Sequence, residues 1–459
     1  MAKKNEFAKN ILTYSIASYL YTAINAISNI FVSNILGPTA NGIISYFNAI
    51  NSNIDKVIYS TLRSSVERTV PQIDDLEKQI EYAQNAFTLN IYSSIIVSIG
   101  FVIYGLCASD YIIQISAYFM SIFNLVHAIS EFYRTWNRSL NKIKMVSIVM
   151  ILVALLIPVC SILFSLLFGI YGFWSGRVVL QLVALFVFLF FTKETIRYCR
   201  LQKDVVRKII ISGGEIVVFS FFTSAFHTID KYFVKAFVGL ESLGYYSVGA
   251  MVFTMLMLVP HSVTGAVYPK FVSMVNRNLF YEVKKYSVYI VTVCIAVSLL
   301  VFILAPTLIE LFMPKYTQSV PIIRILLIAF VSYSSVQLPY IDIIRKKKVP
   351  ALIKNCTVSF IITLIAFFIV SYQQPSIAVY AWCNVLGFCL LAGSIIYTWQ
   401  TMYEIKKSNT KFLEILEFFA PAIIMSPLYL ALPINTIFKI CISIILLITF
   451  VAFKILIHK

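Results

Sequence analysis

Two arginines lie inside long apolar stretches of this sequence, where they could bind an anion. Arg177 and Arg324 each stand a few residues within such a stretch. A guanidinium group offers five N–H donors in a planar fork, which suits diphosphate or acidic sugar oxygens. Together with Lys231 they are candidates for binding an anionic group. In the alternative interpretation, the arginines only neutralise acidic neighbours such as Glu215 and Asp230.

Polar side chains recur every three or four residues within several stretches. At 3.6 residues per turn they form a stripe on one helix face, which a helix surrounded by lipid has no reason to maintain. We therefore expect these faces to line a wet cavity or to pack on one another. The stripes comprise Tyr14, Ser18, Tyr21, Asn25 and Asn29; Asn41, Ser45, Asn48, Ser52, Asp55 and Tyr59; Asn124, His127, Glu131 and Arg134; and Ser212, Glu215, Thr223, His227 and Asp230.

Three amides of these stripes and a neighbouring lysine are candidates for binding a substrate. They are Asn25, Asn29, Asn48 and Lys56. The amides could equally hydrogen-bond a neighbouring helix. Lys56 could instead extend to the membrane surface or pair with Asp55.

Four carboxyl groups within the stretches are candidates for coupling to a proton or a cation. They are Asp55, Glu131, Glu215 and Asp230. Burial favours the neutral form of a carboxyl group and an approaching arginine favours the charged form, so a moving neighbour can drive proton uptake and release. The histidines of the same stretches are more typical of hydrogen-bonded core residues than of a proton relay.

The sequence predicts neither a catalytic site nor a cofactor or metal site. Its eight cysteines are scattered without a Cys-x-x-Cys pair, and no nucleotide-binding glycine motif or His-Glu-x-x-His motif occurs. The net charge of +17 is distributed among short loops rather than gathered in one patch, so we expect no nucleic-acid partner. A transporter is therefore favoured over an enzyme.

The composition indicates an all-α polytopic membrane protein. Hydrophobic residues make up 60% of the chain, charged residues 12%, and the mean hydropathy is +0.86. Apolar runs of about 20 residues recur, each able to cross a bilayer as a helix. About 14 helices are expected, near residues 11–35, 39–61, 84–108, 111–133, 144–168, 170–192, 209–230, 240–267, 286–305, 320–341, 351–371, 376–400, 413–432 and 436–457.

The basic residues predict the orientation. Most of the 37 Lys and Arg residues fall in alternate loops, whereas Lys231, Lys235 and Lys315 lie on the opposite side. Cytoplasmic loops of bacterial membrane proteins carry such an excess. We expect both termini on the cytoplasmic side of a bacterial inner membrane.

An internal repeat predicts two lobes of six helices each. Segment 31–42 aligns with segment 233–244, matching Gly37 with Gly239 and Gly42 with Gly244. Each copy joins the first helix of a six-helix block to the second, and transporters are often built from such repeats. We expect an N-terminal lobe at 1–192, a basic linker at 193–208, a second lobe at 209–400 and an added helix pair at 401–459.

The repeat region resembles the polysaccharide flippases of the multidrug, oligosaccharidyl-lipid and polysaccharide exporter superfamily. The resemblance is carried by Asp230-Lys231, Gly239, a Gly-x-Tyr-Ser starting at Gly244, and Pro269-Lys270, with the segment 35–42 as a first-loop motif. It implies two lobes forming a V around a central cavity, alternating access, and an undecaprenyl-diphosphate-linked glycan as substrate. A polysaccharide polymerase and a chain-length regulator are further partners to consider.

Three other functions remain open on the sequence. A multidrug or cation antiporter of the same superfamily usually has 12 helices, and the peptidoglycan-precursor flippase is expected to carry several arginines in its first two helices. A polysaccharide polymerase is expected to have a long external loop rich in arginine. This chain departs from each pattern, and a repeat-unit exporter of an O-antigen or capsule fits best.

Overall fold

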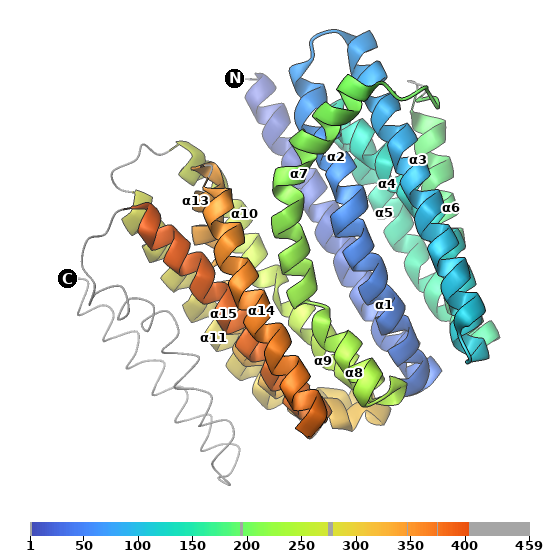
Figure 1. The fold of residues 1–459 in the computed structure, drawn as a ribbon, viewed down its shortest axis with the longest axis vertical. Coiled ribbons are helices and arrows are strands. Elements are labelled where there is room, and N and C mark those ends of the chain that lie inside the picture. The colour runs from blue at the N-terminus through green and yellow to red at the C-terminus, as the bar shows by residue number, and fades with distance from the viewer. Residues whose placement is uncertain (1, 193–195, 274–278, 347, 374, 404–459) are drawn as a thin grey trace. The chain divides into compact units, whose positions relative to one another are not determined.

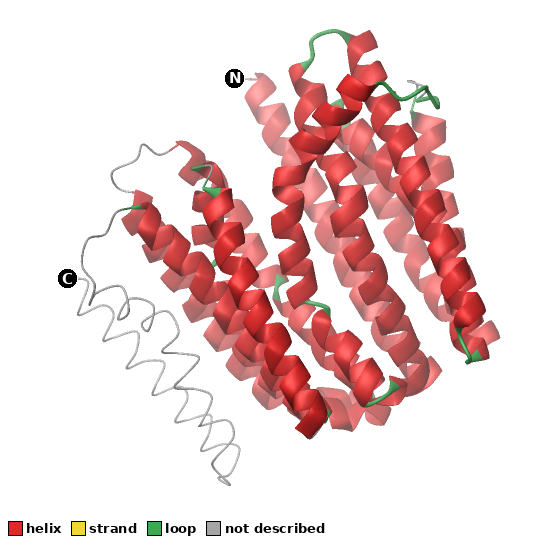
Figure 2. Cartoon of the chain, viewed as in Figure 1, coloured by secondary structure: helices red, strands yellow, loops and turns green. Residues whose placement is uncertain are grey.

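The described part of the chain is built from helices and the short loops between them (Figures 1 and 2). The computed structural model describes residues 2–192, 196–273, 279–346, 348–373 and 375–403. Within these ranges no strand occurs, which confirms the predicted all-α class. The helices predicted at 413–432 and 436–457 lie outside the described residues.

Two compact units divide the chain, Met1–Thr228 and Ile229–Lys459. The lobe boundaries expected from the sequence remain predictions. The first unit contains α1 (Ala2–Ile54), α2 (Ser60–Thr69), α3 (Leu76–Cys107), α4 (Tyr111–Ser139), α5 (Ile143–Pro158), α6 (Phe164–Phe191) and α7 (Lys203–Phe226). The second contains α8 (Ile229–Phe237), α9 (Leu240–Leu256), α10 (Leu258–Ser273), α11 (Leu279–Phe312), α12 (Val320–Ser334), α13 (Gln337–Arg345), α14 (Val349–Gln373) and α15 (Ile377–Met402).

Short π and 3-10 turns interrupt the α-helices. The π-helical turns are η1 (Asp55–Tyr59) and η3 (Val159–Leu163), and the 3-10 turns are η2 (Val70–Gln72) and η4 (Pro314–Ser319). A π-helical turn holds one more residue than an α-helical turn, and it often marks a functional site. η1 lies in the second polar stripe predicted from the sequence.

The helices are long and apolar enough to cross a membrane many times. Nine stretches of the described residues qualify by length and composition. Two of them, Thr13–Gln72 and Ile143–Phe191, contain 60 and 49 residues, whereas one crossing needs about 20. Each bends at a glycine with positive φ, Gly37 or Gly169, and so holds two of the predicted spans. The chain is a multi-pass membrane protein.

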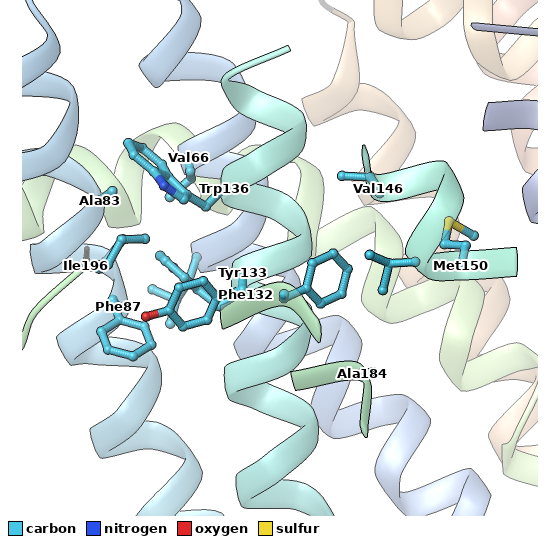
Figure 3. Close-up of a cluster of buried hydrophobic side chains, with 14 of the residues drawn as sticks. Val66, Ala83, Phe87, Phe132, Tyr133, Trp136, Val146, Met150, Ala184 and Ile196 are labelled. Carbon is cyan, nitrogen blue, oxygen red and sulfur yellow. The ribbon is translucent and has the colours of Figure 1, made fainter. Parts of the chain in front are cut away.

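Aromatic and aliphatic side chains fill the interior of the first unit (Figure 3). Phe87 on α3 lies 5.2 Å from Phe132 and 5.8 Å from Tyr133 on α4, measured between ring centroids. Because lipid tails are as apolar as these side chains, close packing rather than exclusion of water holds such helices together. This cluster fixes α4, which carries one of the predicted polar stripes, against α3.

Two glycines that follow the bend of α6 at Gly169 bring its backbone against the chain before the bend, at the start of α6 and in η3. A Cβ atom at Gly172 would lie 1.8 Å from the carbonyl oxygen of Phe164, and one at Gly176 would lie 1.9 Å from that of Cys160. No other residue fits at such distances, and small residues spaced by four are a common device for close helix packing in membranes. The contact fixes the part of α6 that carries Arg177.

The matched glycines of the internal repeat share one backbone conformation. Gly37 has φ 81° and ψ 175°, and Gly239 has φ 111° and ψ 175°. This region of backbone conformation is accessible almost only to glycine. The aligned glycines therefore lie at similar turns, one within α1 and one between α8 and α9.

Alanine at either glycine is expected to destabilise the fold. Gly37→Ala and Gly239→Ala should each lower the free energy of unfolding by about 1–3 kcal/mol, because the side chain would strain the backbone. Thermal and denaturant unfolding of the purified protein in detergent measures the effect. The matched control is Gly100→Ala in the middle of α3, where the backbone is helical and a Cβ meets nothing within 4 Å. An equal loss in the control would contradict the strain argument.

Candidate functional site

Arg177 on α6 is held by one amide and three aromatic rings. Its Nη1 donates a hydrogen bond of 2.5 Å to Oδ1 of Asn48. Its Cζ lies 4.6 Å from the ring centroid of Phe123, 5.7 Å from that of Phe173 and 5.9 Å from that of Trp174. All three rings are buried. Cation–π contacts of this kind stabilise a guanidinium by about 0.5–2 kcal/mol each.

The charge of Arg177 is not neutralised within the described residues. No carboxylate there forms an ion pair with it, whereas Arg63 on α2 and Arg134 and Arg138 on α4 have such partners. The side chain is half-buried, and the bond from Nη1 to Asn48 is the only hydrogen bond that it forms among the described residues. A fixed, uncompensated cation with free N–H donors is the arrangement that an anion site requires.

Asp55 is paired with an arginine that the sequence analysis did not select. Nη2 of Arg63 lies 2.8 Å from both carboxylate oxygens of Asp55, and Nε2 of His127 lies 3.7 Å from Oδ1. Arg63 thereby neutralises a carboxylate that stands in the π-helical turn η1. Lys56, its neighbour in sequence, is exposed and does not join this cluster.

Two further ion pairs follow the same face of α4. Arg134 pairs with Glu131 one turn away. Arg138 pairs with Glu67 on α2 and donates a 2.9 Å hydrogen bond from Nη1 to the hydroxyl of Tyr14 on α1. Glu131 is therefore a paired carboxylate in this structure, as Asp55 is.

The remaining candidates of the first unit are two amides and a carboxyl group. Asn25 and Asn29 on α1 are half-buried, and neither forms a side-chain hydrogen bond among the described residues. Glu215 belongs to α7, but its side chain lies outside the described part of the structure. The roles of these three residues stay predictions.

In the second unit, neutral donors surround a buried carboxylate. Asp230 on α8 is 2% exposed. Its Oδ2 accepts hydrogen bonds of 2.6 Å from the hydroxyl of Tyr246 on α9 and from Nδ2 of Asn384 on α15. Its Oδ1 accepts a 2.8 Å bond from the backbone N–H of Lys231. Asp230 is thus anchored without an arginine.

Arg324 on α12 lies against an aromatic ring of α11. Its Cζ is 4.4 Å from the centroid of Phe302, and its Nε is buried with no hydrogen-bond partner among the described residues. No carboxylate in that part of the chain pairs with it. Arg324 resembles Arg177 in resting on an aromatic face, although no amide holds it.

A family model described as "Polysaccharide biosynthesis protein" matches residues 7–275, more than half of the chain. The chain belongs to this family. No curated protein matches it. The family assignment agrees with the resemblance carried by the motifs around Asp230 and Gly244.

Solved structures of transporters share the fold. "Lipid II flippase MurJ" in an inward closed conformation aligns with a TM-score of 0.63 at 15% identity, over 97% of this chain and 100% of that one. An inward-facing multidrug resistance MATE family transporter of the MOP superfamily aligns with a TM-score of 0.61 at 14% identity, over 87% of this chain and 100% of that one. A MOP superfamily transporter from Pyrococcus furiosus gives 0.57 at 14% identity, over 87% and 97%. At these identities the likeness establishes the fold alone.

In this family member, sequence reasoning missed the residues that hold the candidate groups. Phe173 and Trp174 precede Arg177 by four and three residues, so helical spacing alone could have suggested that their rings lie beside it. No comparable signal exists for Phe123 or Asn384, because each contacts its partner across a long stretch of chain. Asn48 was a candidate from its polar stripe, but its bond to Arg177 could not be predicted.

The Asp55–Arg63 pair should behave as a coupled unit. Asp55→Asn is expected to lower the free energy of unfolding by about 2–3 kcal/mol, because it leaves Arg63 largely buried without a counter-charge. Arg63→Gln should cost a similar amount. The double variant should lose clearly less than the sum of the two, and denaturant unfolding in detergent measures all three. Strict additivity would mean that the two side chains do not interact.

Proposed function

We propose that the chain is a flippase that moves an undecaprenyl-diphosphate-linked oligosaccharide, the repeat unit of an O-antigen or capsule, from the cytoplasmic to the periplasmic leaflet of the inner membrane by alternating access. Membership of the polysaccharide biosynthesis family supports a glycan-related substrate. A fold shared with transporters supports movement rather than catalysis. The chain would then be a transporter and not an enzyme.

The uncompensated charge of Arg177 is the observation that carries this proposal. A diphosphate linked to a lipid is anionic, and it must leave water to enter a chamber among helices. A guanidinium with free donors can replace the lost hydration through charge-assisted, bidentate hydrogen bonds. A cationic drug, the cargo expected of a multidrug antiporter, would be repelled at the same position.

The other substrate-binding candidates fit this proposal to different degrees. Arg324 offers a second cation without a carboxylate partner in the described residues. Asn48 acts through Arg177, which it already binds. Lys231, Asn25, Asn29 and Lys56 remain candidates for polar contacts with the glycan or the diphosphate.

Among the candidates for ion coupling, we favour Asp230. Asp55 and Glu131 are each paired with an arginine, which a bound proton or cation would have to displace. Asp230 is held by a hydroxyl, an amide and a backbone N–H, so an ion that binds it displaces no arginine. Glu215 remains a candidate on sequence grounds.

A deletion strain tests the function directly. If the proposal holds, lipid-linked repeat units accumulate on the cytoplasmic leaflet, and the intact chain restores their export. Exported but unpolymerised units would instead indicate a polymerase. Arrest of peptidoglycan synthesis would indicate a precursor flippase, and altered drug sensitivity with normal glycan export would indicate an antiporter.

Transport should be strongly reduced when the positive charge of Arg177 is removed or is paired with an introduced carboxylate. Arg177→Gln and Asn48→Asp are each expected to lower the export of lipid-linked units by about tenfold or more, since a loss of ~1.4 kcal/mol in binding already gives tenfold. Asn48→Asp is informative because it neutralises Arg177 while leaving the arginine in place. Pulse-labelled glycan reaching the periplasmic leaflet measures export.

Arg200→Gln is the matched control, because Arg200 is an exposed arginine of the loop before α7. It should export normally. If Arg177→Gln also exports normally while the protein is folded and abundant, Arg177 is not the anion site.

Loss of the charge on Asp230 should uncouple transport from the ion gradient. Asp230→Asn keeps the shape and part of the hydrogen bonding with Tyr246 and Asn384. We expect export in membrane vesicles to become insensitive to collapse of the gradient, and slower than that of the intact protein at full gradient. Glu241→Gln, which changes an exposed carboxylate on α9, should keep the dependence. A gradient-dependent Asp230→Asn protein would exclude Asp230 as the coupling group.

A further inference from the structure

We propose that the polar face shared by α1 and α4 is a transfer path for the anionic head group, with Arg138, Arg134 and Arg177 binding it in turn. In this proposal Glu67 neutralises Arg138 and Glu131 neutralises Arg134 whenever no anion is bound there. We call this the placeholder role of the two carboxylates. The inference rests on the proposed function and deepens it, because it names how an anion reaches Arg177. The ligand class is a lipid-linked phosphate or diphosphate.

The spacing on α4 puts the charged groups in one line. His127, Glu131, Arg134 and Arg138 follow one another at intervals of four, three and four residues. At 100° per residue they occupy an arc of roughly 60°, and they extend over ~16 Å of the helix. The line begins near the end of α4 that the basic residues assign to the cytoplasm.

Contacts at both ends of the line join it to its neighbours. At one end, the hydroxyl of Tyr14 on α1 accepts a hydrogen bond from Arg138. At the other end, the ring of His127 stacks on that of Phe123 with 5.2 Å between the centroids, and Cζ of Arg177 lies 4.6 Å from the Phe123 centroid. Phe123 therefore connects the line with the arginine that we assign to the anion. Both α1 and α4 belong to the first unit, so the path needs no contact with the second.

The ion pairs are open to exchange because the protein does not fully enclose their side chains. Those of Arg134 and Glu131 are 32% and 14% exposed, and those of Arg138 and Glu67 are 36% and 32% exposed. Here an incoming phosphate oxygen can take the place of a carboxylate oxygen on the same guanidinium.

The anion should bind more tightly at the Arg177 end of the path than at Arg138 and Arg134. At Arg138 and Arg134 the anion must displace a carboxylate, so net binding there is weak and release is fast. At Arg177 no carboxylate of the described residues competes, and the anion is held more firmly. Asp55 and Arg63 neutralise each other beside this line, so they neither attract nor repel the anion strongly.

Binding of inorganic pyrophosphate by the purified chain in nanodiscs tests the placeholder role. Glu131→Gln removes the competing carboxylate, and it should tighten pyrophosphate binding at least tenfold while export of lipid-linked glycan slows. Arg134→Gln in the same protein should reverse the gain in affinity. Tighter binding with slower turnover is a result that a merely structural ion pair would not give.

Glu241→Gln is the control for a general change in charge and should leave the dissociation constant unchanged. If Glu131→Gln binds pyrophosphate as the intact chain does, or more weakly, the placeholder role is wrong. The proposed function would still stand if Arg177→Gln abolished export in that case. If lipid-linked glycan reached the outer leaflet equally well without the protein, the proposed function itself would fail.

Discussion

Every charged group placed among these helices must be compensated, and this requirement organises the first unit. An ionised side chain in the hydrocarbon region costs several kcal/mol unless a partner or water replaces its hydration. Asp55, Glu131 and Glu67 meet the requirement through arginines. Arg177 meets it through an amide and aromatic faces, which compensate the loss of water without cancelling the charge. The function that we assign to the chain follows from that difference.

Much of the fold could be predicted from the sequence, because the bilayer leaves few choices. A run of about 20 apolar residues has to cross as a helix, since its backbone groups find no partner in lipid. The breaks at Gly37 and Gly169 fall between predicted spans for the same reason: a chain that turns at the membrane surface needs a residue tolerant of positive φ. Arg177 and Asp230 could be selected as candidates as well, because a charged residue within an apolar run is unusual.

The partners of these residues could not be predicted, because they depend on packing and on local helix geometry. Arg63 follows Asp55 by eight residues, which in a regular α-helix would separate the two by roughly 80° around the axis. The π-helical turn at Asp55–Tyr59 absorbs one additional residue, so the spacing acts nearly as two full turns and brings both side chains to one face. The sequence of that segment contains no pattern that predicts a π-helical turn. Asn48 and Asn384 meet their partners only after distant helices have packed.

The way in which Arg177 is held is compatible with the anion site that we propose for it. A carboxylate would stabilise the arginine more strongly, but it would also occupy the donors that an anion needs. Buried aromatic rings lie around the guanidinium without accepting its N–H bonds, and Asn48 accepts a single hydrogen bond without adding charge. A lysine could not be held in this way, because its ammonium group has no planar face to stack and would be more strongly hydrated. The combination of a stacked face, a fixed edge and an open set of donors is therefore specific to arginine, and it suits a ligand that brings its own negative charge and must later be released.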